Sequence, residues 1–113
     1  MKVSRLSPFW FEDPISSAAE IVPLLREDSD LVIALTHIGL RRDLELAASV
    51  PGIDLVVGGH SHAVLDEPRV VGKTVILQAG SWGRHLGKAE ITMPARSGDS
   101  VRVRETLVSL TSA

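Results

Sequence analysis

The chain has 113 residues, of which 44% are hydrophobic and 23% charged. This composition is typical of one folded domain and excludes a disordered chain. Its 12 basic and 14 acidic residues give a net charge of −2 without a basic block, so no nucleic-acid-binding surface is expected. The chain has no cysteine, which excludes disulfides and thiolate metal sites. No apolar run reaches the roughly 18 residues that cross a bilayer, so no membrane segment is expected.

The first part of the chain predicts a short strand followed by a helix. Phe9-Trp10-Phe11 suits a strand or an edge segment. We expect these aromatic side chains to pack in the core rather than to stack on a nucleobase, because they gain much from burial. Asp13 and Pro14 are typical of a helix start, and Pro23 should kink the helix or tighten its end. The apolar face of this helix would carry Ile15, Ala18, Ala19, Val22 and Leu25.

Residues 31–57 predict a strand, a helix and a second strand. The first strand is expected from residue 31 up to His37 and Gly39, where it ends, and the second at residues 53–57. The helix is expected at residues 40–50, closed by Pro51-Gly52. The helix would bury Leu40, Leu44, Ala47 and Ala48 and turn Arg41, Arg42, Asp43 and Glu45 to the other side. Such a unit makes its two strands parallel. Ligands bind at the carboxyl ends of the strands in open parallel sheets.

Histidines lie at the carboxyl ends of both predicted strands. His37 lies at the end of the first, and Gly58-Gly59-His60-Ser61-His62 comes after the second. On an extended chain His60 and His62 would face the same way, and the two glycines would allow close approach of backbone or ligand. His37, His60 and His62 can therefore converge on a metal ion, for which imidazole is a good ligand. The alternative is a glycine-rich turn that carries surface histidines.

The remaining residues predict antiparallel strands. Residues 69–77 should form a hairpin with Gly72-Lys73 at its turn, and the loop at residues 78–83 should lie near the histidines. Residues 86–93 and 101–108 should pair as a second hairpin at the edge of the sheet. We expect His85 not to be a metal ligand, and Arg41 and Arg42 to be solvated rather than to bind phosphate.

Two motifs resemble those of calcineurin-like metallophosphoesterases, and the 5'-nucleotidase branch is the most similar. They lie at residues 34–39 and 51–62, flanked by similar segments at residues 10–14 and 77–87. The resemblance covers residues 9–91. It implies an α/β fold that is part of a layered α/β/β/α sandwich, in which parallel strands with crossover helices are followed by antiparallel strands.

The resemblance also implies a metal-dependent hydrolase of nucleotides or related phosphomonoesters. By this pattern His37 and His60 would bind one divalent ion and His62 its neighbour; the ions could be Zn, Mn, Fe, Co or Ni. Two ions about 3.5–4 Å apart polarise phosphoryl oxygens and generate a hydroxide nucleophile. The resemblance further implies a periplasmic or cell-surface location.

The chain departs from this pattern in its upstream motifs. Asp-x-His, Gly-Asp and Gly-Asn-His-Asp do not precede residue 34, and the chain has no Asn. We therefore expect residues 1–113 to be a single partial metallophosphatase domain, inactive alone, marginal or prone to aggregate. Its partner would be the missing N-terminal half, and a C-terminal nucleotidase domain would also be absent. The alternative is a truncated, non-catalytic fragment or a metal-binding or interaction module.

Overall fold

The computed structural model describes residues 3–6, 9–96 and 98–110. Its helices in these ranges are α1 (Pro14–Asp28) and α2 (Leu40–Ser49). Its strands there are β1 (Val3–Leu6), β2 (Phe9–Glu12), β3 (Ile33–Leu35), β4 (Leu55–Val57), β5 (Arg69–Val71), β6 (Thr74–Leu77), β7 (His85–Thr92) and β8 (Arg102–Ser109). No helix among the described residues is both long and apolar enough to cross a membrane.

Helix α1 begins as its sequence predicts. The Asp13 carboxylate accepts a hydrogen bond from the Ser16 amide at 3.0 Å, which satisfies one of the amides that a helix start leaves free. This bond is the largest effect that lowers the pKa of Asp13, and nearby Arg42 lowers it further. Pro23 lies inside α1 without ending it. The predicted apolar face is only partly right, because Val22 is buried whereas Leu25 is 47% exposed.

The central sheet has four strands in the order β3-β4-β6-β5. β3, β4 and β6 run parallel, which confirms the strand–helix–strand prediction. β5 pairs antiparallel with β6 across the predicted turn at Gly72-Lys73. The parallel strands place their carboxyl ends at one edge of the sheet.

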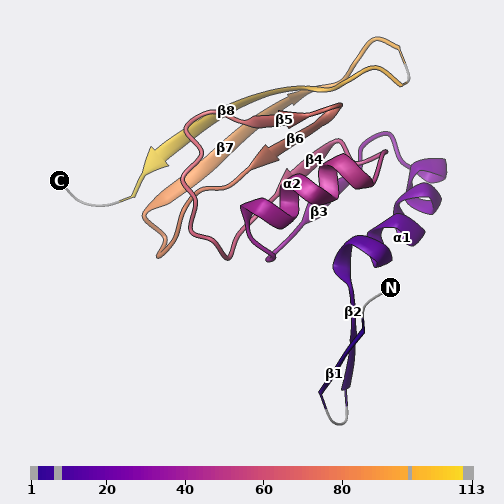
Figure 1. Cartoon of the computed structure of the whole chain (residues 1–113). Helices are drawn as coiled ribbons and strands as arrows, with labels where there is room; N and C mark the ends of the chain where they lie inside the picture. The colour runs from indigo at the N-terminus through magenta and orange to yellow at the C-terminus, as the bar shows by residue number, and fades with distance from the viewer. Residues whose placement is uncertain (1–2, 7–8, 97, 111–113) are drawn as a thin grey trace.

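Alternating side chains on the central strands supply two cores, one on each face of the sheet. Val56 and Ile76 point toward α1 and α2 and are 0% exposed. Leu55 and Val75, each the preceding residue on the same strand, point the other way, as the two-residue period of a strand requires. The sheet therefore lies between a helical layer and a second β layer (Figure 1).

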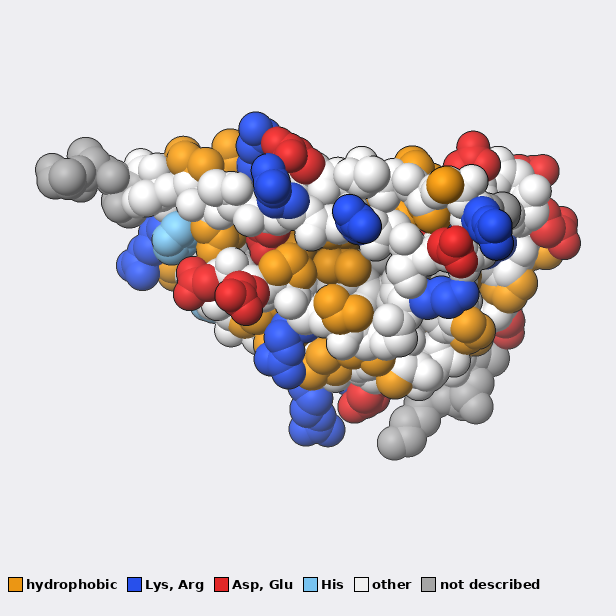
Figure 2. Space-filling model, turned by 90° about the horizontal axis from the view of Figure 1, so that it is seen from above, with side chains coloured by type: hydrophobic (Ala, Val, Ile, Leu, Met, Phe, Trp, Pro, Cys, Tyr) orange, Lys and Arg blue, Asp and Glu red, His pale blue; other side chains and the backbone are white. Residues whose placement is uncertain are grey.

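The second β layer is the β7–β8 hairpin. The sequence predicted this hairpin but placed it at the sheet edge, and that placement is wrong. Ile91 and Val103 pack from the hairpin against the core that faces them, so the hairpin covers a face of the central sheet. Its own outer face mixes apolar side chains with charges of both signs (Figure 2). Helices, sheet and hairpin make three of the layers expected of an α/β/β/α sandwich.

The β1–β2 hairpin extends away from these layers (Figure 1). Trp10 is 63% exposed and Phe11 is 53% exposed, so the prediction that they pack in the core is wrong. The side chain of Phe9 lies outside the described residues. The edge strand β3 also carries an exposed apolar side chain, since Leu35 is 85% exposed. Burial of such side chains needs a facing surface, and the described residues do not provide one here.

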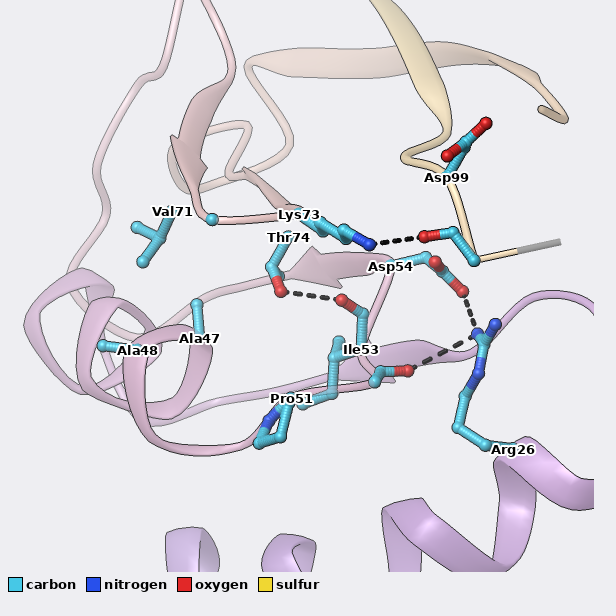
Figure 3. A pocket seen from close by; sticks show the side chains of 13 residues that line it. Arg26, Ala47, Ala48, Pro51, Ile53, Asp54, Val71, Lys73, Thr74 and Asp99 are labelled. Atoms are coloured by element: carbon cyan, nitrogen blue, oxygen red, sulfur yellow. Dashed lines mark hydrogen bonds and ion pairs between the residues drawn. The ribbon is translucent and has the colours of Figure 1, made fainter. Parts of the chain in front are cut away.

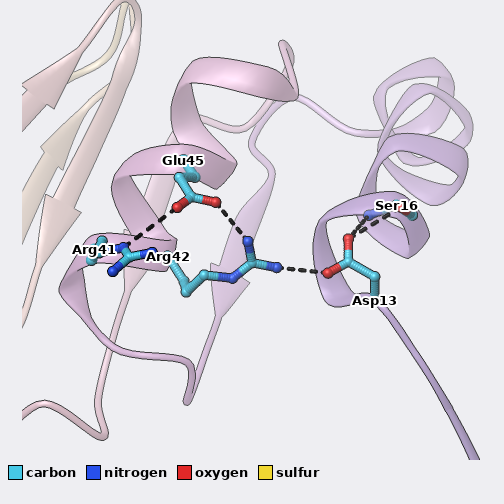
Figure 4. A network of polar contacts seen from close by, with 5 residues as sticks. All are labelled: Asp13, Ser16, Arg41, Arg42 and Glu45. Atoms are coloured by element: carbon cyan, nitrogen blue, oxygen red, sulfur yellow. Dashed lines mark hydrogen bonds and ion pairs between the residues drawn. The ribbon is translucent and has the colours of Figure 1, made fainter. Parts of the chain in front are cut away.

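A small polar network joins the start of α1 to α2 (Figure 4). The Arg42 guanidinium donates to Asp13 at 2.6 Å and to Glu45 at 2.6 Å. Arg41 is an exposed partner of the same Glu45, at 3.7 Å. Arg42 thus has a structural role, and Arg41 is solvated as predicted.

Candidate metal centre

Three polar side chains follow directly on the carboxyl ends of the parallel strands. His37 lies two residues after β3, His60 three residues after β4, and Gln78 immediately after β6. The backbone ties these three ends together, because the Thr36 amide donates to Val57 at 2.9 Å and the Gly58 amide donates to Leu77 at 2.8 Å. We call this edge of the sheet the histidine end.

His37 and His60 meet at the histidine end. His37 Nε2 and His60 Nδ1 are 3.3 Å apart, and the ring centroids are 5.0 Å apart at an interplanar angle of 71°. Two ligands bound tetrahedrally at about 2.0–2.1 Å from one zinc ion would be separated by about 3.3–3.4 Å. The observed separation therefore fits two nitrogens that share one ion. It is also long but acceptable for a hydrogen bond between neutral rings, whose direction depends on the tautomers.

His62 lies outside this pair. Its side chain is exposed and makes no hydrogen bond to any described residue. Among the residues that the structure describes, no three His, Asp or Glu side chains gather closely enough to hold a metal ion. The assignment of His62 to a second ion therefore stays a prediction.

The backbone at His60 and His62 differs from the extended chain that we expected. His60 has φ 79° and His62 has φ 61°, so both adopt the left-handed conformation and the chain bends between them. This conformation costs roughly 1–2 kcal/mol for a residue with a Cβ. It persists only when the surroundings hold it, and it is found often at functional sites.

Asp43 is buried beneath the histidine end, although it was predicted on the polar side of its helix. Its carboxyl is 0% exposed, and its Oδ1 accepts a hydrogen bond from the Thr36 hydroxyl at 2.7 Å. Its Oδ2 is buried without a partner among the described residues. Burial raises the pKa of Asp43, and the Thr36 hydrogen bond partly opposes this. Gly58 allows the contact, because a Cβ there would lie 2.2 Å from Oδ2.

Gln78 is a further polar residue that the sequence did not single out. It is 2% exposed, and its side-chain amide contacts the turn that carries both histidines. The loop after β6 was predicted near the site, and these contacts confirm that. A polar residue that ends a wholly buried strand was the available signal.

The fourth histidine takes no part in the pair. His85 begins β7 and makes no hydrogen bond with His37 or His60, and its Nδ1 is buried without a partner in the described residues. Our prediction that it is not a ligand remains untested.

A hollow with apolar and charged lining lies at the opposite end of the same strands (Figure 3). This cavity, of about 780 Å³, is lined by residues that include Arg26, Pro51, Asp54 and Lys73. Its cationic groups already have partners, since Arg26 pairs with Asp54 at 2.5 Å and Lys73 donates to the Gly98 carbonyl at 2.5 Å. We call this edge the salt-bridge end.

Comparison with known proteins places the chain among phosphoesterases. The chain is 42% identical over 86 residues to the trifunctional nucleotide phosphoesterase protein YfkN of Bacillus subtilis (strain 168), matching 72% of this chain and 6% of that protein. It is 30% identical over 111 residues to the 5'-nucleotidase of Vibrio vulnificus (strain CMCP6), matching 71% of this chain and 20% of that protein.

A solved structure agrees. The crystal structure of a 5'-nucleotidase precursor from Thermus thermophilus superposes with a TM-score of 0.79 and 29% identity, over 95% of this chain and 25% of that one. No protein-family model matches the chain. The chain thus spans a quarter or less of the length of these proteins.

Proposed function

Because this chain belongs to the metallophosphoesterases of the 5'-nucleotidase branch, we propose that it forms the histidine-bearing part of a metal-dependent hydrolase of nucleotides or related phosphomonoesters. The observation that supports this best is the 3.3 Å separation of His37 Nε2 and His60 Nδ1 at the carboxyl ends of two adjacent parallel strands. A periplasmic or cell-surface location belongs to the same proposal.

We propose one role for each histidine of this end. His37 and His60 would hold one divalent ion, since their nitrogens have the spacing of neighbouring ligands. His62, two residues further along the same turn, would bind a neighbouring ion. When bound, divalent ions would polarise phosphoryl oxygens and supply a nucleophile near neutral pH. Nitrogen ligands alone suit several metals, so the choice among Zn, Mn, Fe, Co and Ni stays open.

The site needs oxygen ligands that the described residues do not place there. Asp43 is the acidic side chain beneath the histidine end, and it is fully buried against Thr36 and Gly58. We propose that residues outside this chain supply the bridging carboxylate and the catalytic acid, and that residues 1–113 form one part of the metallophosphatase domain. The exposed edge strand β3, next to His37, is where a further strand could add.

A second candidate function is a non-catalytic chain that binds one ion or none, or that serves as an interaction module. The observation in its favour is that His62 does not join the other two histidines in the described residues. The two candidates differ in metal stoichiometry, because about two ions per functional assembly are needed for dinuclear chemistry.

The test combines metal binding with single substitutions. We would titrate the chain, and the complete gene product that contains it, with Zn²⁺ and Mn²⁺ by calorimetry and assay phosphatase activity on nucleotides. His60→Ala and His62→Ala should abolish activity of the complete product with little loss of fold. His85→Ala, a histidine outside the pair, is the matched control and should retain activity. Full activity after loss of His60 would contradict the ligand assignment. Binding of one ion or none by the complete product would favour the non-catalytic candidate.

A further inference from the structure

The turn that carries His60 and His62 is contacted by one buried side-chain amide, in addition to the backbone hydrogen bonds that Gly39 and Gly80 donate to Gly59 and Ala63. We define the histidine turn as residues 59–63. Both of its histidines have positive φ, and such a backbone is retained only where its surroundings over-determine it. Gln78 contacts three residues of the turn and is itself 2% exposed.

Every hydrogen-bonding position of the Gln78 amide is used on this turn. Its Oε1 accepts from the Ser61 hydroxyl at 2.9 Å and from the Ala63 amide at 3.0 Å. Its Nε2 donates to the Gly59 carbonyl at 3.3 Å and toward Ser61 Oγ at 3.3 Å. A primary amide offers two acceptor sites and two donor hydrogens, so no capacity is left over.

The bonds also determine which way the amide points. In the reversed orientation the NH₂ group would face the Ala63 N–H, and the oxygen would face the Gly59 carbonyl. Both contacts would be repulsive, because two donors would face each other at Ala63 and two acceptors at Gly59. The side chain therefore has one orientation, and it links the residue before His60 to the residue after His62.

Ser61 extends this hold to the neighbouring helix. Its hydroxyl oxygen accepts a hydrogen bond from the Leu40 amide, at the first position of α2, at 3.1 Å. The N-cap residue Gly39 has no side chain to do this. Gln78 thus fixes Ser61 between two structural elements, while the imidazoles on either side of Ser61 stay exposed.

From these contacts we infer that Gln78 is a positioning residue for the metal site: it holds the histidine turn so that His60 and His62 present their rings at the sheet edge. The inference rests on the proposed function for its consequence in metal binding. It does not rest on it for the conformation of the turn, which can be measured without metal.

The test compares Gln78→Ala and Gln78→Glu with Thr74→Val. Thr74 begins β6, the strand that Gln78 directly follows; it is 3% exposed and donates one hydrogen bond to the Ile53 carbonyl at 2.7 Å. It is the matched control for loss of a buried polar contact. Glutamate keeps both acceptors but, when ionised, cannot donate to Gly59, so its effect should be intermediate.

Two readouts separate positioning from simple destabilisation. The first is amide hydrogen exchange at Ala63, whose N–H should be protected in the unmodified chain and lose protection in Gln78→Ala but not in Thr74→Val. The second is Co²⁺ affinity, read from its visible absorption, which should fall by about 10–100-fold in Gln78→Ala, as for other outer partners of metal ligands. Gln78→Glu should fall between, and Thr74→Val should stay within about twofold of the unmodified chain.

The outcomes are distinct. If both variants change exchange and affinity no more than Thr74→Val does, the inference is wrong. If the unmodified chain binds no Co²⁺, the proposed metal site fails in this chain, and Ala63 exchange alone decides whether Gln78 holds the turn. If Gln78→Ala does not fold, Gln78→Glu and the unmodified chain decide: an Ala63 amide that exchanges like a free loop amide would overturn the inference.

Discussion

The two ends of the central sheet use polar side chains in opposite ways. At the salt-bridge end, Arg26 and Asp54 neutralise each other at 2.5 Å, and Asp54 also accepts the Val32 amide at 2.9 Å. At the histidine end, the two side chains that contact each other at the surface are like imidazoles, His37 and His60. The strands that join the ends are the same, and the middle residues of β4 and β6 are buried.

The difference indicates which end is structural and which is available for binding. At the salt-bridge end the charged groups fasten α1 to β4, so they are already satisfied within the fold. At the histidine end, buried groups such as Asp43 and Gln78 support side chains that themselves face solvent. Polar groups that are held in place but have spare ligand capacity are typical of a binding site.

The largest effect is expected from two neighbouring glycines at the histidine end, one of which supports the fold and the other the histidines. In Gly58→Ala the new Cβ would lie 2.2 Å from Asp43 Oδ2. Because that carboxyl is buried and a Cβ cannot approach so closely, we expect a loss of about 3 kcal/mol in the free energy of unfolding, at the upper end of the usual cost of overpacking. In the matched Gly59→Ala the Cβ would meet His37 Nδ1 at 3.1 Å, and this exposed ring can move aside. Urea unfolding and imidazole NMR should show the first variant losing stability and the second disturbing the histidine pair. Equal stabilities would contradict the distinction.

At the salt-bridge end, Asp54→Ala should cost stability and leave the histidines unaffected. The carboxylate accepts two hydrogen bonds, one of them from the Arg26 guanidinium, so we expect a loss of about 1.5–3 kcal/mol. Asp99→Ala, an exposed acid lining the same cavity, is the control and should change little. Chemical denaturation together with Co²⁺ titration checks both halves. A weaker Co²⁺ affinity in Asp54→Ala would show that the two ends are coupled.

A smaller effect of opposite sign is expected from His60→Gly. Glycine accepts the observed φ of 79° without strain, whereas alanine does not. The glycine variant should therefore be more stable than His60→Ala by about 1 kcal/mol, while both lose the imidazole equally. Thermal unfolding of the two variants measures the difference. If they unfold at the same temperature, the left-handed backbone at residue 60 carries no strain.

The smallest effect is expected from Glu105→Gln, which tests whether a buried polar atom without a partner among the described residues indicates a functional residue. Glu105 Oε2 is buried without a partner among the described residues, and burial, with the nearby Asp66 carboxylate, raises the pKa of Glu105. A raised folded pKa means that stability is greatest below the unfolded value of about 4.3 and falls as pH rises through the folded pKa. Glu105→Gln should therefore raise Tm slightly near neutral pH and lose that advantage in acid. Glu90→Gln, an exposed acid on the same hairpin, should show no such gap. Weaker Co²⁺ binding in Glu105→Gln would instead link this residue to the site.

Local patterns predicted the elements of this fold well where one short segment decides them. The structure has the predicted Asp13 cap and the predicted turn at Gly72. The rule that parallel strands end at one edge of the sheet correctly predicted that His37 and His60 lie close together. Asp43 was misplaced because its charge was given more weight than its position. It follows Leu40 by three residues, so it lies on the buried face of α2 by helical geometry.

Other errors arose where packing between distant segments decides the outcome. The alternation in β7 and β8 predicted a hairpin, but not that it would cover a face of the sheet. The aromatic character of Trp10 predicted burial, yet burial needs a facing surface that the described residues lack. The role of Gln78 was missed because its partners in the turn lie 15 to 19 residues earlier in the chain.

The hydrogen bond from the Leu40 amide to Ser61 has a consequence for the order in which segments fold while the chain is being synthesised. Helix α2 is complete in sequence at Ser49, yet its first turn is capped by a hydroxyl 21 residues after Leu40. That hydroxyl is in turn held by Gln78. During synthesis the start of α2 should therefore fray until β6 has emerged from the ribosome and docked, so that this helix and the histidine turn become ordered in one late, cooperative step.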